Sequence, residues 1–269
     1  MPKFDIDISD KKEIGKTGEY VSAIGLGSYG IRDYKTALES YVYAIENGIS
    51  LIDTAQIYGT EDFVGSVIKR VGKERIFVDT KIWPNRLTSK DEVLKAAKES
   101  LQRLGLSTVD LFLIHWPNRD ISIEEQVRNF EEIYLQGLAR YIGVSNFTVS
   151  DLERAIHATR KAELVVDQVR YSVSDKKIES DLLKYCIDHN ITIQAYTPIE
   201  HGRVVNNKVI GQIAKKYNKT PIQVALNYLI SRPKVIPIPK AEKLDHVKEI
   251  LGAMGWRLKA EDIEELEKI

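Results

Sequence analysis

Short apolar stretches alternate with longer amphipathic ones along this chain, and that alternation restricts the fold more than any other feature. Most of the short stretches are apolar on both faces, which is typical of parallel strands buried between a barrel interior and covering helices. The eight expected strands are residues 23–26, 50–52, 76–80, 111–114, 141–144, 165–168, 192–195 and 235–238.

The stretches between the expected strands have the apolar spacing of helices that pack on a core. Within residues 90–104 the apolar side chains recur every three or four positions, so they fall on one helical face. Residues 36–46 and 123–135 repeat this pattern, and a last helix is expected over residues 259–269. The expected N-caps are Asp33, Ser89 and Ser180.

A β-hairpin is expected before the first of these strands. Residues 12–14 and 20–22 flank a turn made by Gly15, Lys16, Thr17 and Gly18. Together with the eight strand–helix units, the hairpin predicts an α/β fold of one domain over residues 1–269. That fold is a (β/α)8 TIM barrel with an N-terminal β-hairpin. A doubly wound sheet uses the same alternation and is the main alternative.

Charge and cysteine content exclude several classes of protein. The 39 basic and 39 acidic residues cancel, so nothing in the bulk charge attracts nucleic acid or an anionic membrane. The single cysteine, Cys186, cannot form an internal disulfide, which fits a reducing compartment. The N-terminus is charged where a signal peptide is apolar, and no apolar run approaches the roughly 20 residues of a membrane span. We expect a cytoplasmic protein, either a monomer or a weak oligomer.

No metal site is expected. The five histidines are scattered, and none is paired with a cysteine or carboxylate at the spacing of ligands on one element.

One motif suggests a different fold. Residues 25–30 have the glycine pattern G-x-G-x-x-G, and Asp53 lies at the end of the next expected strand, as in a Rossmann nucleotide-binding unit. A hairpin precedes the motif, however, and three residues separate Gly30 from the expected helix. We therefore expect these glycines to let the first barrel strand turn into its loop.

Polar residues stand at the ends of three consecutive expected strands. Asp53 and Tyr58 follow the second strand, Lys81 the third and His115 the fourth. In a (β/α)8 barrel these ends meet at the catalytic face. A buried aspartate and lysine would neutralise each other. An ammonium near a phenol lowers its pKa from about 10 toward the working pH, which suits a general acid.

Each of these residues also has a structural explanation when it is taken alone. A lone histidine at a strand end, or a lone Asp–Lys pair, more often stabilises a fold than performs chemistry. Their joint occurrence at adjacent strand ends favours the catalytic interpretation. In that interpretation Tyr58 protonates a carbonyl oxygen while hydride reaches the carbonyl carbon, and His115 orients the carbonyl or relays the proton. Trp83 and Trp116 would form apolar walls.

The chain resembles the aldo-keto reductase family over nearly its whole length. Seven motifs occur in family order: DTAQIYG, TKIWP, LIHWP, GVSNF, DQVRY, AYTPI and IPIPKAE. The resemblance implies a catalytic tetrad of Asp53, Tyr58, Lys81 and His115. It also implies a nicotinamide cofactor extended across the barrel mouth, without a Rossmann domain. Substrate would lie against Tyr29, Trp83, His115 and Trp116.

The resemblance further implies a set of cofactor contacts. Ser145, Asn146 and Gln168 would hold the carboxamide, and Tyr171 would stack on the nicotinamide ring. Thr197, Pro198 and Ile199 match residues along the pyrophosphate. The remaining expected cofactor-binding residues are Gly27, Ser28, Asp53, Lys240, Ala241, His246 and Glu249.

The adenosine end departs from the family pattern. The family's NADP signature contains a Lys-Ser pair, then an arginine, then an asparagine, and here the corresponding residues are Lys240, Ala241, His246 and Ile250. Lys240 can still pair with a 2′-phosphate. Ala241 lacks a hydroxyl donor, and His246 replaces a permanently charged guanidinium with an imidazole. We expect NADP(H) as the cofactor, with a weakened preference that also admits NAD(H).

The function expected from this resemblance is NADPH-dependent reduction of aldehydes and ketones. The chain ends soon after its last helix, which implies an open site for small carbonyl substrates. Two alternatives remain. One is a cofactor-binding regulatory subunit, like the family's potassium-channel β subunits, although the chain has no extended N-terminal arm. The other is an unrelated barrel enzyme, a hydrolase or an aldolase that forms a Schiff base on Lys81.

Overall fold

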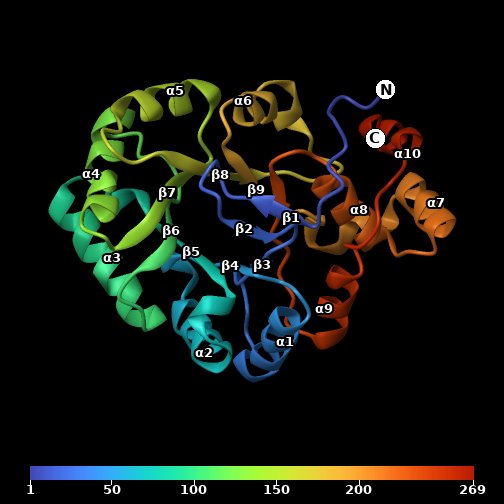
Figure 1. Cartoon of the computed structure of the whole chain (residues 1–269), viewed down its shortest axis with the longest axis horizontal. Coiled ribbons are helices and arrows are strands. Elements are labelled where there is room, and N and C mark those ends of the chain that lie inside the picture. Colours follow the sequence, from blue (N-terminus) through green and yellow to red (C-terminus); the bar gives the residue numbers. More distant parts are fainter.

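A computed structural model describes all 269 residues and contains a closed barrel of eight parallel strands (Figure 1). Each strand pairs with the next one in the sequence. The two outermost strands also meet, because the Gly25 and Gly27 amides donate to the Pro237 and Pro239 carbonyls at 3.0 Å. The strands are β3 (Leu26–Gly27), β4 (Leu51–Asp53), β5 (Phe77–Ile82), β6 (Val109–Ile114), β7 (Ala139–Ser145), β8 (Leu164–Arg170), β9 (Thr192–Tyr196) and β10 (Val235–Pro237). The predicted barrel is confirmed.

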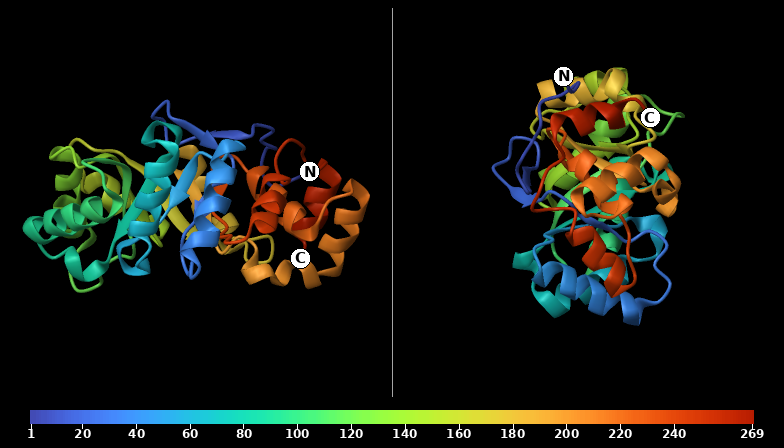
Figure 2. Two further views of the ribbon diagram at one scale, coloured as in Figure 1. Left: turned by 90° about the horizontal axis from the view of Figure 1, so that it is seen from below. Right: turned by 90° about the vertical axis from the view of Figure 1, so that its right-hand side faces the viewer.

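Helices surround the barrel, as the two turned views in Figure 2 show. Two of them follow β9 where the alternation predicted one, and a final helix follows the last strand–helix unit. They are α1 (Tyr34–Glu46), α2 (Glu61–Val71), α3 (Lys90–Leu104), α4 (Ile123–Leu135), α5 (Val149–Ala158), α6 (Leu182–Asp188), α7 (Lys208–Tyr217), α8 (Pro221–Ile230), α9 (Leu244–Leu251) and α10 (Ala260–Glu267).

Local sequence explains where these helices begin and end. The Ser89 hydroxyl accepts the Glu92 amide hydrogen at the start of α3, and the helix stops at Gly105, whose φ of 69° favours glycine. Asp33 caps α1 in the same way. The predicted cap Ser180 is wrong, because Ser180 ends a short 3₁₀ helix and its hydroxyl donates to the Lys177 carbonyl. The neighbouring Asp181 carboxylate caps α6 instead.

The hairpin of β1 (Lys11–Glu13) and β2 (Tyr20–Ser22) covers the amino-terminal end of the barrel. Ile14 and Val21 are buried among apolar residues of the barrel interior. The Gly15 amide also donates to the hydroxyl of Thr192, the first residue of β9, at 2.9 Å. The hairpin therefore closes this end, and the carboxyl end of the strands is left to form a site.

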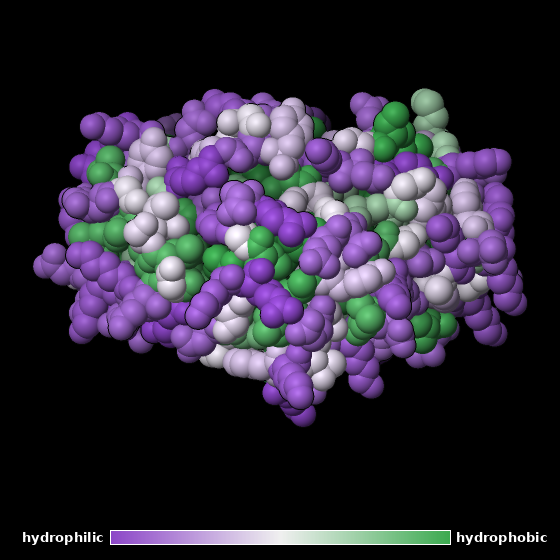
Figure 3. Space-filling view, turned by 60° about the horizontal axis from the view of Figure 1, so that its bottom comes forward, coloured by the Kyte–Doolittle hydropathy of each residue, from purple (hydrophilic) through white to green (hydrophobic).

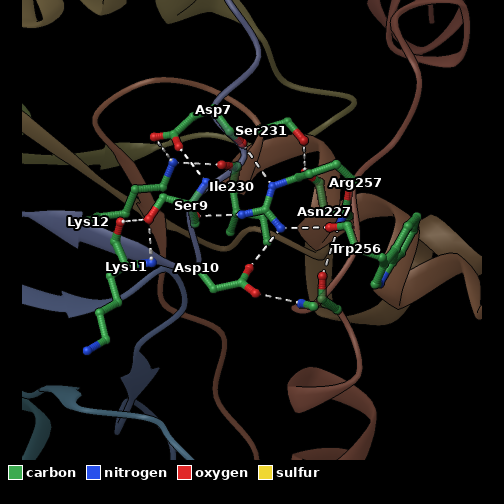
Figure 4. A network of polar contacts seen from close by, with 12 residues as sticks. Asp7, Ser9, Asp10, Lys11, Lys12, Asn227, Ile230, Ser231, Trp256 and Arg257 are labelled. Carbon is green, nitrogen blue, oxygen red and sulfur yellow. Dashed lines mark hydrogen bonds and ion pairs between the residues drawn. The ribbon is translucent and has the colours of Figure 1, made fainter.

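The N-terminal segment is tied to the last third of the chain by the polar network in Figure 4. Arg257 donates to the Asp7 carbonyl at 2.9 Å and to Asp10 Oδ1 at 2.8 Å. The buried Lys12 ammonium binds Asp7 Oδ2 at 2.5 Å and the Ile230 carbonyl at 2.7 Å. These bonds hold the hairpin against α8 and against the segment that leads from α9 to α10.

The glycines of the G-x-G-x-x-G motif serve the barrel. A side chain at Gly27 would lie 2.9 Å from the Ile238 carbonyl oxygen, and one at Gly25 would lie 2.8 Å from Leu51. Gly30 has a φ of +75° in the turn that follows, and α1 begins only at Tyr34. The prediction that this motif is not a Rossmann fingerprint is confirmed.

On the face that Figure 3 shows, hydrophilic side chains surround several apolar patches. None of the helices combines the length and the apolar character that crossing a bilayer requires.

Candidate active site

A cavity of about 750 Å³ opens at the carboxyl end of the barrel, and residues in the carboxyl-terminal part of each of the eight strands or directly after it contribute to its wall. Its size falls in the range of small-molecule and cofactor sites. Most of the site residues expected from the sequence line it: Gly27, Tyr29, Asp53, Tyr58, Trp83, His115, Trp116, Ser145, Asn146, Gln168, Thr197, Pro198, Ile199, Lys240, His246 and Glu249.

The structure brings Asp53, Tyr58, Lys81 and His115 together, with Lys81 buried behind the part of the cavity wall that the other three residues line. The fully buried Lys81 ammonium donates to Asp53 Oδ1 at 2.5 Å and to the Thr54 carbonyl at 2.7 Å. The same nitrogen lies 4.7 Å from the centre of the Tyr58 ring. The Tyr58 hydroxyl lies 3.4 Å from His115 Nε2. A phenol hydroxyl thus faces the cavity between a cation and an imidazole.

Burial governs the acidity of Tyr58. Removal from water raises the pKa of the phenol, and the Lys81 ammonium lowers it by a smaller amount, so the pKa lies above its ordinary value. The sequence prediction of a lowered pKa is therefore wrong for this structure, because it included the cation and left out desolvation. Tyr58 holds its proton at neutral pH, which is the form a general acid needs at the start of a reduction.

Lys81 remains charged despite its complete burial. Desolvation alone would lower the pKa of the ammonium, but the Asp53 carboxylate raises it above the ordinary value. Since the amine is both protonated and bound to Asp53, it is poorly suited to attack a carbonyl as a Schiff-base nucleophile. This counts against the aldolase alternative.

His115 is neutral. Burial and then the charge of Lys81 lower the pKa of the imidazole to about 3. Its Nε2 faces Tyr58, and its buried Nδ1 has no hydrogen-bond partner in the protein. A neutral imidazole can donate or accept one hydrogen bond at Nε2, so it can orient a carbonyl oxygen beside the phenol.

A second buried carboxyl group, that of Asp79, lies next to Asp53, and its role was not predicted from the sequence. Asp79 lies two residues before Lys81 on β5, directly opposite Asp53 on β4, and is fully buried. Its Oδ2 accepts from Gln194 Nε2 at 2.8 Å, its Oδ1 has no donor in the protein, and the carboxyl is close enough to Asp53 for their charges to interact. Two carboxylates cannot bond to each other unless one carries a proton. An aspartate inside a strand expected to be buried, two positions before Lys81, was the available signal.

Asp79 is the member of this pair that carries the proton. Burial, and then the negative charge of Asp53, raise the pKa of Asp79 well above its ordinary value. The Asp79 carboxyl can then donate to Asp53 while Asp53 also accepts from Lys81 and, at 2.7 Å, from Gln168 Nε2. Asp79 therefore helps to hold the anionic Asp53 in place without adding a second charge.

This assignment predicts the effect of Asp79→Asn on stability. Since folding raises the pKa of Asp79, the unfolded chain ionises this group first, and the native state loses stability as pH rises above about 4. An asparagine amide can donate to Asp53 and accept from Gln194 without that penalty. We expect Asp79→Asn to raise the melting temperature at pH 7, with a gain that disappears near pH 4.

Calorimetry at the two pH values checks this, with Asp110→Asn as the matched control. Asp110 is another buried strand carboxylate, but it binds Lys73 at 2.5 Å and Arg140 at 3.1 Å, so its replacement should destabilise the protein at pH 7. A melting temperature of Asp79→Asn that falls at pH 7 as that of the control does would show that Asp79 is ionised.

Amide and hydroxyl groups lie beside the tetrad, after β7, β8 and β9. Asn146 has a left-handed backbone with a φ of 62°, and its Nδ2 donates to Ser145 Oγ at 2.9 Å. The Tyr196 hydroxyl donates to Asn146 Oδ1 at 2.9 Å. Gln168 presents its side chain from β8 to the same cavity. The donors of this group bond within the protein, Ser145 Oγ to the Gln168 carbonyl and Gln168 Nε2 to Asp53 and Gln194, so a bound amide would exchange for some of these bonds.

The structure contradicts the role expected for Tyr171. Its ring is fully buried and its hydroxyl donates to Glu179 Oε1 at 2.6 Å, away from the cavity. β8 ends at Arg170, and the chain then turns Tyr171 into the core. Tyr196, at the end of the next strand, is the aromatic residue that lines the cavity. Tyr196 is the tyrosine of the AYTPI motif, so the sequence already placed an aromatic residue at this position.

Two residues expected at the cofactor also lie outside the cavity wall. Ser28 is fully buried, and its hydroxyl shares a 2.8 Å hydrogen bond with Thr60 Oγ1. Ala241 packs in the core beside α9. Neither side chain can contact a ligand in the cavity. Lys240, His246 and Glu249 do line it. His201 and Ile222 also line it, although the sequence favoured a solvated loop at His201 and gave no signal for Ile222, which lies in α8.

The comparison with known proteins agrees with this geometry. The sequence pattern of the Aldo/keto reductase family matches residues 23–269. The chain is 36% identical over 248 residues to a methylglyoxal reductase of Escherichia coli, with 90% of each chain covered. It is 35% identical over 249 residues to a glyoxal reductase of Bacillus subtilis, covering 91% of this chain and 87% of that one.

Solved structures give the same result. A thermostable aldo-keto reductase crystallised with the inhibitor epalrestat superimposes with a TM-score of 0.89 at 38% identity, over 96% of this chain and 98% of that one. An aldo/keto reductase of Klebsiella pneumoniae in complex with NADP and acetate superimposes with a TM-score of 0.90 at 29% identity, over 97% and 95% of the two chains. The chain belongs to the aldo/keto reductase family.

Proposed function

We propose that this protein is an NADPH-dependent carbonyl reductase that converts small aldehydes and ketones to alcohols, with Tyr58 as the general acid. The observation that carries the proposal is the Tyr58 hydroxyl, which is held 3.4 Å from a neutral imidazole with a buried ammonium beneath its ring. The named relatives reduce methylglyoxal and glyoxal, which supports small aldehydes as the substrate class. We further propose that it works in the cytoplasm as a monomer or weak oligomer.

The residues around the cavity fit a nicotinamide dinucleotide. Near Tyr58, the Ser145, Asn146 and Gln168 side chains bring a hydroxyl and two amides to the cavity, and a carboxamide could exchange with the hydrogen bonds that these groups make to one another. Tyr196 provides an aromatic face beside them. At the other end Lys240 supplies a cation for a phosphate. When bound, NADPH supplies the hydride that the protein itself lacks.

The protein's own residues supply the proton and the orientation. A substrate carbonyl oxygen placed between Tyr58 and His115 accepts a hydrogen bond from each, which fixes its carbon for hydride addition. The Tyr58 proton passes to that oxygen as the alcohol forms, and the Lys81 ammonium stabilises the phenolate that remains. Asp53 keeps Lys81 in place. Water then restores the proton to Tyr58.

Aromatic side chains shape the part of the cavity that receives substrate. The Trp83 ring lies edge-on to His115 with centroids 5.1 Å apart, and Tyr29 makes a similar contact with Tyr58 at 5.0 Å. Trp116 also lines the cavity and is partly exposed. These rings give the substrate an apolar surface at the open side of the cavity, where Tyr29 and Trp116 remain exposed.

Turnover of methylglyoxal and p-nitrobenzaldehyde by the purified protein tests this function. We expect loss of NADPH absorbance in proportion to alcohol formed, with a rate that saturates in aldehyde. Tight NADPH binding without turnover of any aldehyde or ketone in a panel would favour a regulatory cofactor-binding role instead.

The low pKa of His115 predicts the pH profile of the reaction. Because burial and Lys81 lower that pKa to about 3, His115 does not titrate between about pH 5 and pH 8. We expect kcat for reduction to be flat across that range. An inflection between pH 6 and 7 that His115→Gln removes would show that the imidazole is protonated during turnover.

A further inference from the structure

The segment that forms the adenosine end of the cavity carries balanced charge. Residues 240–249 contain three lysines and three acidic residues, so the segment as a whole does not attract a phosphate. The three lysines are also not equally available. Lys240 lines the cavity, whereas Lys248 lies over the Tyr43 ring of α1 at 5.7 Å. Attraction for a 2′-phosphate therefore depends mainly on Lys240.

Lys240 is already paired. Its Nζ donates to Glu242 Oε1 at 2.9 Å. The same carboxylate oxygen accepts the backbone amide hydrogen of Arg32 at 3.0 Å, and the Glu242 carbonyl accepts from the Ser40 hydroxyl at 2.8 Å. Both the side chain and the backbone of Glu242 are thus fixed between β10, α1 and the loop after β3.

Glu242 is negatively charged at neutral pH. The hydrogen bond from Lys240 lowers the pKa of the carboxyl, and the Arg32 amide adds to this effect. The side chain of Glu242 is also less exposed than that of Lys240, at 22% against 37%, so water screens the carboxylate only in part. A dianionic phosphate bound to Lys240 would have to displace this carboxylate or lie beside it.

We propose that Glu242 is a cofactor-specificity residue that weakens the preference for a nucleotide with a 2′-phosphate and allows NADH to bind with an affinity close to that of NADPH. This inference rests on the proposed function, in which Lys240 supplies the cation for a phosphate at the end of the cofactor away from Tyr58. A carboxylate beside the ribose repels a phosphate group and accepts a hydrogen bond from a 2′-hydroxyl.

Other charged groups near the ribose do not reverse this effect. Glu249 lines the cavity and adds a second negative charge. Lys243 precedes α9 as its N-cap residue, and Asp245 in the first turn offsets it. The α9 N-terminus favours an anion to a small degree, but its dipole is screened beyond the first turn. Glu242 is the only one of these residues that is bonded to Lys240.

Replacement by glutamine tests this role with little change in shape. Glu242→Gln keeps an oxygen that can accept from Lys240 and Arg32, and it removes the charge. We expect the Kd of NADPH to fall about fivefold to tenfold, which corresponds to a change near 1 kcal/mol. The Kd of NADH should stay the same or rise. Isothermal titration of both nucleotides against the whole protein measures these constants without turnover.

Asp245→Asn is the matched control, because it removes the same charge from the same segment and Asp245 has no bond to Lys240. We expect it to leave the ratio of the two Kd values nearly unchanged. Raising the salt concentration should shrink the Glu242→Gln effect, as screening weakens charge repulsion.

The outcomes separate this inference from the proposed function. If neither nucleotide binds the unaltered protein, the proposed function is wrong. If both bind and Glu242→Gln leaves the NADPH to NADH ratio unchanged, or changes it no more than Asp245→Asn does, the specificity role of Glu242 is wrong and the proposed function stands.

Discussion

Replacement of Tyr58 by phenylalanine is expected to lower kcat for aldehyde reduction by roughly a thousandfold, within the range that general acids contribute. The substitution removes only the hydroxyl that faces His115 at 3.4 Å. The ring keeps its contacts with Lys81 at 4.7 Å and with Tyr29 at 5.0 Å, so the cavity keeps its shape. The Kd of NADPH should therefore stay close to that of the unaltered protein. Steady-state rates and nucleotide titration measure the two effects separately.

Tyr29→Phe is the matched control for this experiment. Tyr29 lines the same cavity, but it is largely exposed and its hydroxyl makes no hydrogen bond within the protein. We expect this variant to keep most of its kcat. If Tyr58→Phe retains most of its kcat as well, Tyr58 is not the acid.

Replacement of Lys81 by methionine is expected to damage both stability and turnover. Lys81 is fully buried and provides the positive charge that neutralises Asp53 at 2.5 Å. Removing one partner of a buried ion pair typically lowers the free energy of unfolding by about 3–5 kcal/mol, because the remaining charge is left unpaired. The variant would also lose the cation that stabilises the Tyr58 phenolate, so kcat should fall about as far as in Tyr58→Phe. Denaturant unfolding and steady-state kinetics check the two parts.

A double variant separates these losses. In Asp53→Asn/Lys81→Met the unpaired charge is gone, and we expect much of the lost unfolding free energy to return while kcat stays low. Recovery of turnover in the double variant would mean that Lys81 acts only by holding the fold. A Lys81→Met protein as stable as the unaltered one would contradict the buried ion pair.

Periodicity predicted parallel strands with the tetrad at their carboxyl ends, and the count of eight strand–helix units favoured the barrel over a doubly wound sheet. Buried strands between amphipathic helices have few alternatives, and strand ends in such a barrel share one face. Asp53, Lys81 and His115 could therefore be grouped before their distances were known. What the sequence could not give was the effect of burial, which depends on every neighbouring atom and reversed the expected direction of the Tyr58 pKa shift.

Contacts between distant segments explain the other omissions. Asp79 meets Asp53 and Gln194 only because β4, β5 and β9 close into one barrel. Glu242 reaches the Arg32 amide across 210 positions of sequence. The choice between Tyr171 and Tyr196 depended on which side chain turns inward after its strand, and a motif alone does not fix that direction.

Isotope transfer shows whether hydride is added to a carbonyl carbon in this cavity. The purified protein is incubated with methylglyoxal and NADPH that carries deuterium at the transferable position of its nicotinamide ring. We predict that each molecule of alcohol carries one deuterium on the former carbonyl carbon, as seen by mass spectrometry. Formation of alcohol without deuterium, or consumption of methylglyoxal without any alcohol, would contradict the account.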